Sequence, residues 1–292
     1  METNSKPCPA LKSFIDYWDE WHKEWYINAS SKPPKIKSIK GWDMPKSIWQ
    51  YFPEPYWGNP NPTELTAVFL NLNPGSGGDD QNITISKKDP ITTYNSKKQV
   101  YSDTVAELIN HLCYPTTNWF FKNRVLWLNC LLQNLGKDHD KTISNIIAGE
   151  LVPWHTQKVS EMKKYINSHI DLIVNHCIQP LAEISQCATL KGVVFCKGAE
   201  VANVLTKKVL KKDHYIYSTS TSTSTSTSTS TSTSTNKPSV HIFEYSGAIF
   251  IVFVGGFNMN LPKLDKEYLS PISHKNVSVA DIINGCLIKK YI

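Results

Sequence analysis

The 292-residue chain contains no run approaching the roughly 20 apolar residues that a membrane-spanning helix requires. Its first residues, METNSKPCPALKS, also lack the apolar segment of a secretion signal. We therefore expect an intracellular protein, cytoplasmic or nuclear, that has no membrane partner.

Several common motifs are missing as well. The seven cysteines are an odd number, and none has the Cys-x-x-Cys spacing of zinc sites and redox motifs. We expect reduced thiols and predict neither a metal site nor a cofactor. The glycine-rich stretch NPGSGGDD at 73–80 matches neither the P-loop pattern nor the Gly-x-Gly-x-x-Gly fingerprint, which argues against both nucleotide-binding classes.

Charge and hydrophobic content are moderate. The chain has 31 Lys and Arg against 25 Asp and Glu, and its net charge of +6 is compatible with a polyanionic partner without requiring one. A hydrophobic content of 40% is ample for a packed core. DNA is therefore one expected partner, and charge alone does not decide the matter.

Apolar runs and helical periodicity alternate along most of the chain, which predicts an α/β fold with a mainly parallel central sheet flanked by helices. The pattern predicts strands over 67–70, 145–156, 191–200, 240–245 and 248–254, and helices over 102–113, 118–136, 159–184, 200–210 and 279–287. Pro180 is expected to kink or divide the helix over 159–184.

The chain divides at about residue 63. Residues 1–63 comprise a helix over 11–27 and a proline-rich lead-in, and residues 64–292 form the α/β domain. The helix carries a stripe of tryptophans that is expected to pack on the core, with stacking on nucleic-acid bases as the alternative. The alternating Ser/Thr run at 218–235 is too polar to bury a core and is predicted to be a disordered insertion.

Polar residues follow the predicted strands where each one ends. Asn73 follows the first strand, Glu150 and His155 lie at the end of the second, and Asn258 and Asn260 follow the last. Open α/β sheets bind ligands at the carboxyl ends of their strands. These side chains are therefore predicted to face one crevice.

The first of these turns resembles a known motif. LNLNPG at 70–75 is similar to the Asn-Pro-Gly motif of the mismatch-specific and single-strand-selective branches of the uracil-DNA glycosylase superfamily. The resemblance implies a three-layer sandwich in which Asn73 positions the attacking water and Pro74 and Gly75 line the substrate site. Asn71 stands where those branches have glycine.

The resemblance extends weakly to two later turns. GELVPWH at 149–155 is similar to the middle motif and implies that Glu150 contacts the edge of the base. An ionised carboxylate only accepts hydrogen bonds, so Glu150 suits a base with two donors, or a ligand that is not a base, better than uracil. Trp154 would then stack on a flipped-out nucleotide.

GGFNMN at 255–260 stands where the last motif of the family would close on the base. Asn258 or Asn260 is the acceptable analogue, and the Pro-Ser pair of that motif is missing. Cleavage of an N-glycosidic bond requires stabilisation of the departing base, to which His155 or Asn258 would donate.

Two functions follow as hypotheses. One is a divergent glycosylase that hydrolyses the N-glycosidic bond of a modified base in DNA, and the alternative is a catalytically silent member of the same fold that binds nucleic acid or a nucleotide. Structural roles also stay open: a turn residue for Asn73, a surface histidine for His155 and a paired carboxylate for Glu150.

Overall fold

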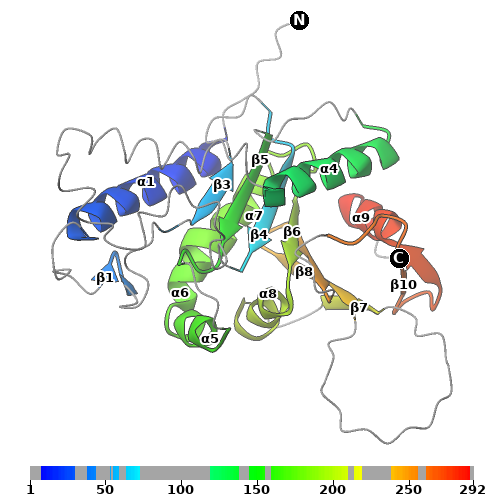
Figure 1. The fold of residues 1–292 in the computed structure, drawn as a ribbon. Helices are drawn as coiled ribbons and strands as arrows, with labels where there is room; N and C mark the ends of the chain where they lie inside the picture. Colours follow the sequence, from blue (N-terminus) through cyan, green and yellow to red (C-terminus); the bar gives the residue numbers. More distant parts are fainter. Residues whose placement is uncertain are drawn as a thin grey trace, which may run out of the picture.

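The computed structural model describes helices packed around one large sheet (Figure 1). The described residues are 8–29, 38–43, 53, 55–58, 64–72, 119–137, 145–154, 159–209, 214–218, 238–255 and 261–289. The predicted helix over 102–113 lies outside them.

The centre of the sheet consists of parallel strands that are buried along almost their whole length. In spatial order they are β5 (Ile146–Glu150), β4 (Ala67–Asn71), β6 (Val193–Lys197) and β9 (Ala248–Val254). Their near-continuous apolar sequences are typical of parallel strands that are covered on both faces. The predicted α/β class is confirmed in this broad sense.

Antiparallel strands extend the sheet on both sides, and within the described part of the chain it has nine strands. The prediction of a mainly parallel sheet is not confirmed, because the sheet is mixed. One cause is the β8–β9 hairpin, whose turn has positive φ at Ser246 (51°) and Gly247 (76°), as tight antiparallel turns require. The flanking strands are β3 (Tyr56–Gly58) beside β5, and β8 (Ser239–Tyr245), β7 (His214–Ser218), β10 (Glu267–Leu269) and β11 (Asn276–Ser278) beyond β9.

The Ser/Thr run begins inside this antiparallel part. Ser218, its first residue, is the last residue of β7 and pairs with Ser239 of β8. The run therefore connects two neighbouring strands, and its remaining residues lie outside the described part of the chain.

The helices begin and end close to the predicted boundaries, with one exception. The predicted helix over 159–184 is divided at His169 and contains a π-helical turn, and Pro180 lies in the first turn of α7, where its missing N–H is tolerated. The described helices are α1 (Pro9–Ala29), α4 (Trp119–Asn134), α5 (Val159–Ser168), α6 (Ile170–Ile173), η2 (Val174–Ile178), α7 (Gln179–Ser185), α8 (Ala199–Val204), η3 (Leu205–Val209) and α9 (Val279–Leu287).

The two faces of the parallel strands are covered by different helices. Gly149 of β5 faces α7 so closely that a Cβ atom there would lie 2.7 Å from Leu181 Cδ1. On the opposite face, Trp127 of α4 packs against Phe195 of β6 and Phe253 of β9. The sheet thus lies between α4 on one side and α7 on the other.

Helix α1 adds a layer of aromatic residues outside α7. Its buried tryptophans belong to the same hydrophobic core as the sheet. Two short paired strands, β1 (Ser38–Ile39) and β2 (Trp42–Asp43), lie against it and bury Trp42. We define the aromatic cluster as Trp18, Trp21, Trp25, Trp42 and Trp154, all at most 1% exposed.

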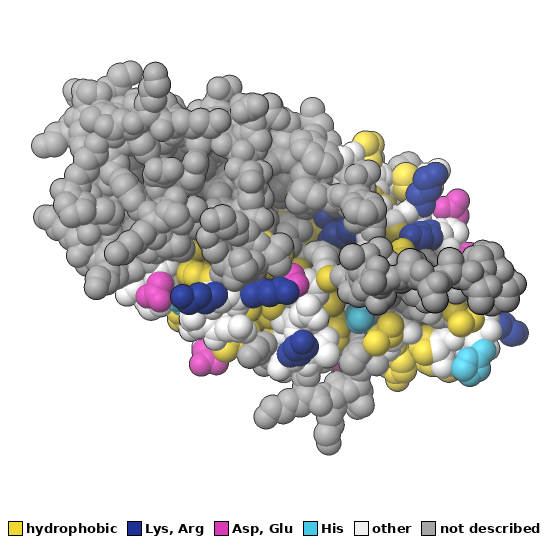
Figure 2. Space-filling model, turned by 60° about the horizontal axis from the view of Figure 1, so that its bottom comes forward, with side chains coloured by type: hydrophobic (Ala, Val, Ile, Leu, Met, Phe, Trp, Pro, Cys, Tyr) yellow, Lys and Arg dark blue, Asp and Glu magenta, His cyan; other side chains and the backbone are white. Residues whose placement is uncertain are grey.

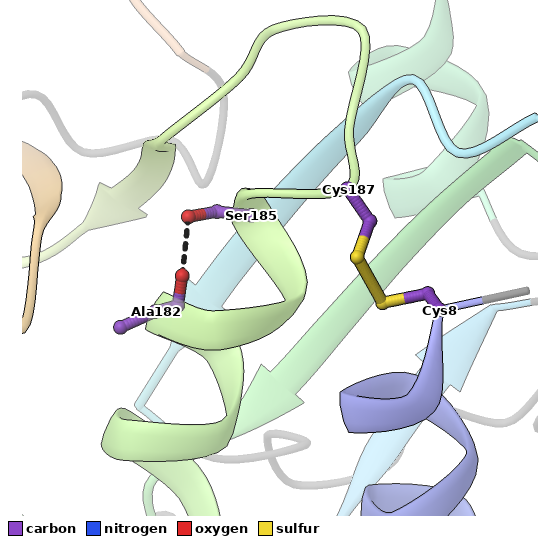
Figure 3. The surroundings of a disulfide bond; sticks show 4 residues. All are labelled: Cys8, Ala182, Ser185 and Cys187. Atoms are coloured by element: carbon purple, nitrogen blue, oxygen red, sulfur yellow. Dashed lines mark hydrogen bonds between the residues drawn. A yellow bond between two sulfur atoms is a disulfide. The ribbon is translucent and has the colours of Figure 1, made fainter. Parts of the chain in front are cut away.

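A disulfide joins the start of α1 to the turn that precedes β6. Cys8 and Cys187 are bonded across 179 residues of sequence, with their Cα atoms 6.0 Å apart (Figure 3). At the end of α7, just before Cys187, the Ser185 hydroxyl donates to the carbonyl oxygen of Ala182. The expectation of reduced thiols is wrong for this pair, because proximity across so long a separation leaves no trace in cysteine spacing.

Candidate functional site at the carboxyl edge of the sheet

The last residues of three neighbouring parallel strands are all polar. Asn71 ends β4, Glu150 ends β5 and Lys197 ends β6. Asn71 is in register with Glu150, and Lys197 follows Cys196, the partner of Leu70. Since side chains alternate between faces, all three lie on the face that α4 covers and form a row across the strand ends.

The order of the strands in the sheet indicates why this row of polar residues matters for binding. The chain passes from β4 to β5 on one side and later to β6 on the other side of β4. Such a reversal of strand order marks the position at which open α/β sheets bind ligands, outside the carboxyl ends of the strands. The row therefore lies where a binding site is expected.

Glu150 is buried and already has a hydrogen bond. The Asn71 Nδ2 amide donates to Glu150 Oε1 at 3.0 Å, and the two side chains are 7% and 3% exposed. Hydrogen bonding is what makes a buried carboxylate tolerable. The pair therefore fixes the direction of both side chains at the strand ends.

Arg124 of α4 lies near Glu150 and over the ring of Phe69. Its guanidinium lies 5.8 Å from the ring centre of Phe69 on β4, and its side chain is buried. Burial lowers the pKa of Arg124 to about 10, and the nearby Glu150 carboxylate opposes this change. Arg124 is therefore still a cation at neutral pH and balances the charge of Glu150.

Lys197 is the second cation of the site. Its Nζ donates to the carbonyl oxygen of Gly255, directly after β9, at 2.6 Å. Burial is the main factor that lowers the pKa of Lys197 to about 8, and repulsion by Arg124 and Lys266 adds to it. Asn71, Arg124, Glu150 and Lys197 are called the carboxyl-edge cluster below.

The chemistry open to this cluster is that of an anion or polar-ring binder. Two cations against one carboxylate leave an excess of positive charge, which favours phosphate or another anion. In the coloured part of Figure 2, Lys and Arg side chains lie among acidic, hydrophobic and uncharged groups. The charge argument therefore depends on the cluster itself and much less on net charge.

Most of the predicted site residues are not described by the structure. Asn73, Pro74, Gly75 and His155 lie outside the described residues, as do Asn258 and Asn260. For these positions the crevice stays a prediction. The strands that precede them end at the same edge of the sheet, since β4, β5, β6 and β9 are parallel.

Trp154 lies away from the cluster. It is 1% exposed, its ring is 5.4 Å from that of Trp21, and its indole N–H donates to the Tyr165 hydroxyl at 2.7 Å. The Trp154 indole therefore belongs to the aromatic cluster, and it is not exposed for stacking on a nucleotide.

Sequence reasoning missed Arg124 and Lys197, although both left a signal. Arg124 lies four residues before Leu128, on the apolar side of the helix, where a charged residue is unusual. Lys197 ends the apolar run VVFC just as Asn71 and Glu150 end theirs. A search for polar residues at the ends of all parallel strands would have found the row.

The described residues contain neither a metal-binding group nor a membrane-spanning helix. Among the residues that the structure describes, no group of three or more His, Cys, Asp or Glu side chains is placed to hold a metal ion. No described helix has the length and apolar character needed to cross a membrane. Comparison of the chain with protein-family models, curated proteins and solved structures finds no match.

Proposed function

We propose that this chain is a divergent uracil-DNA glycosylase-like protein of the three-layer type that binds DNA and hydrolyses the N-glycosidic bond of a modified base. The observation that carries the proposal is the carboxyl-edge cluster at the reversal of strand order, in which Asn71 is two residues before the Asn73-Pro74-Gly75 motif. Asn73 would orient the water and Lys197 would attract the phosphate backbone, while the buried Arg124 balances the charge of Glu150.

The state of Glu150 supports a base other than uracil. Its carboxylate accepts from Asn71 and lies beside Arg124, so it offers acceptors and no donor to a ligand. A base edge with two N–H donors fits this better than the acceptor-rich edge of uracil.

The same contact also favours the second candidate, a catalytically silent nucleotide-binding protein. A carboxylate that is compensated by an amide and a guanidinium holds the strand ends in place without taking part in chemistry. Both candidates require binding, and only the first requires bond cleavage.

A cleavage panel separates them. Labelled single- and double-stranded oligonucleotides that carry uracil, hypoxanthine, xanthine or hydroxymethyluracil are incubated with the protein, treated with alkali and resolved on a gel. We expect cleavage of at least one substrate, lowered about 100-fold or more by Asn73→Ala, since the loss of one positioned polar group costs roughly that much. Asn167→Ala, on the exposed side of α5, is the matched control.

Binding is measured in parallel by fluorescence anisotropy with the same oligonucleotides over a salt series. Binding without cleavage of any base would favour the silent protein. Neither binding nor cleavage would reject both candidates.

A further inference from the structure

Lys197 is placed unlike an ordinary surface lysine. It is the last residue of β6, it is partly buried, and it extends the row formed by Asn71 and Glu150. The hydrogen bond to Gly255 ties its amine to the residue that directly follows β9, the neighbouring parallel strand. The nitrogen is therefore positioned at the edge where the strands predict a ligand.

Charged groups around Lys197 favour its neutral form. Arg124 from α4 and Lys266 from the segment before β10 are cations, and the carboxylate of the cluster, Glu150, is two strands away and balanced by Arg124. With a pKa of about 8, set first by burial, about a quarter of the Lys197 amines are uncharged at pH 7.5, against about one in a thousand at the ordinary value of 10.5. Desolvation beside another cation is a known way to make a lysine nucleophilic.

We propose that Lys197 is a nucleophilic amine that forms a Schiff base with an aldehyde, namely the ring-opened sugar of an abasic nucleotide. The choice of aldehyde depends on the proposed function, because excision of a base leaves that sugar behind. Exposed Lys266, which is close enough to Lys197 to repel it, carries the charge that suits the phosphates on either side of this sugar.

The chemistry balances without an oxidant or reductant. The Nζ lone pair attacks C1′, and the carbonyl π electrons move to the oxygen, which takes up a proton. The nitrogen then loses a proton, the hydroxyl leaves with another proton as water, and a C=N bond replaces the C=O bond. Hydride from an added borohydride reduces this bond and makes the link permanent.

The test uses the full chain and an oligonucleotide in which an abasic site has been made beforehand. Sodium cyanoborohydride is added, covalent complexes are resolved on a denaturing gel, and mass spectrometry of peptides locates the modified residue. We expect a complex at Lys197 that Lys197→Gln and Lys197→Arg each reduce at least about 100-fold. An amine with the ordinary pKa of 10.5 is uncharged more than about 100-fold less often at pH 7.5 than one with a pKa of about 8. Lys191→Gln, at the exposed amino end of the same strand, should trap like the wild type.

A pH series sharpens the assignment. The trapping rate should rise around pH 8, and Lys266→Gln should move the midpoint upward because one repelling cation is removed. Circular dichroism and denaturant unfolding of each variant show whether it is folded. Lys197→Arg keeps the charge and serves if Lys197→Gln does not fold.

The inference is overturned if the wild type traps nothing, if trapping survives both Lys197 substitutions, or if the modified peptide contains another lysine. The two experiments test the Schiff base and the proposed function separately. Trapping of the preformed abasic site without cleavage in the base panel rejects base excision alone, whereas cleavage without trapping rejects the Schiff base alone.

Discussion

Polar groups are buried both in the aromatic cluster around α1 and in the carboxyl-edge cluster, but they have different partners. Around α1 they are neutral and donate mainly to backbone carbonyls or hydroxyls: Trp18 to His176 O, Trp21 to Ile39 O and Trp42 to the Tyr17 hydroxyl. At the carboxyl edge the groups carry charge: Glu150 accepts from Asn71 and lies near Arg124, and Lys197 donates to Gly255 O and is repelled by Arg124.

Two basic side chains show what this difference means. His22 is completely buried, hydrogen bonds to Pro53 O at 2.9 Å, and has its pKa lowered to about 4 by burial. Lys197 has a lowered pKa at a partly buried strand end. A neutral base sealed in the core serves stability, whereas one at the edge of a sheet is available for chemistry.

The largest loss of stability should follow from creating a cavity in the aromatic cluster. Trp21→Ala removes a fully buried indole that contacts Trp18 and Trp154, and should lower the free energy of unfolding by about 3–5 kcal/mol. Urea unfolding at neutral pH measures this loss. Ile27→Ala, 67% exposed on the same helix, should change it by less than about 0.5 kcal/mol. Equal effects of the two substitutions would refute a structural role for the cluster.

His22 provides a pH test of the same region. Its pKa is lower in the folded chain than the ordinary value of 6.5, so the unfolded chain binds more protons between pH 6.5 and 4. The stability that neutral His22 contributes is complete above pH 6.5. Below that pH it falls by about 1.4 kcal/mol per pH unit, so the total loss near pH 4 is about 3 kcal/mol.

Denaturant unfolding from pH 7 to 4 measures this dependence. His22→Gln keeps an N–H donor but does not titrate, so its curve should be flatter than that of the wild type by about the same 3 kcal/mol. Asn167→Ala, exposed on α5 and without a titratable group, should leave the slope unchanged. Parallel curves for the wild type and His22→Gln would mean that His22 is not sealed from water.

The disulfide ties α1 to the sheet and should contribute a similar or smaller amount. Cys187→Ser should lower the free energy of unfolding by about 2–4 kcal/mol in oxidising buffer, since it releases a loop of 179 residues in the unfolded chain. Reductant should lower the wild type to the same value. Cys130→Ser, an exposed free thiol, is the control, and sensitivity to reductant in Cys187→Ser would contradict the assignment.

The central strands were predictable because their apolar runs are long and end in polar turns. β5, β6 and β9 lie within the predicted ranges, β4 extends one residue beyond its predicted end, and α9 spans the predicted 279–287. The short strands β3, β10 and β11 were missed, because three residues carry too little periodicity to stand out, and β7 went unnoticed beside the Ser/Thr run.

The candidate site is only partly visible in the sequence, and most of its predicted residues lie outside the described part of the chain. Glu150 was identified from its place at a strand end, and Asn71 appeared only as a departure from a motif. Arg124 is 26 residues before Glu150 in the sequence, so their proximity arises from the packing of α4 on the sheet. No local pattern contains that information.

The smallest expected effect is the energetic coupling between Glu150 and Arg124. Glu150→Gln keeps an acceptor for Asn71 but removes the charge, and Arg124→Met keeps the apolar contact with Phe69. In a double-mutant cycle the two changes should be non-additive by about 1–2 kcal/mol, because each alone leaves the other charge buried. Glu244→Gln, exposed near the opposite end of the sheet, should add independently to Arg124→Met. Additivity at Glu150 as well would mean that the two charges do not act together, and the carboxyl edge would then resemble the aromatic cluster in being a set of separate structural contacts.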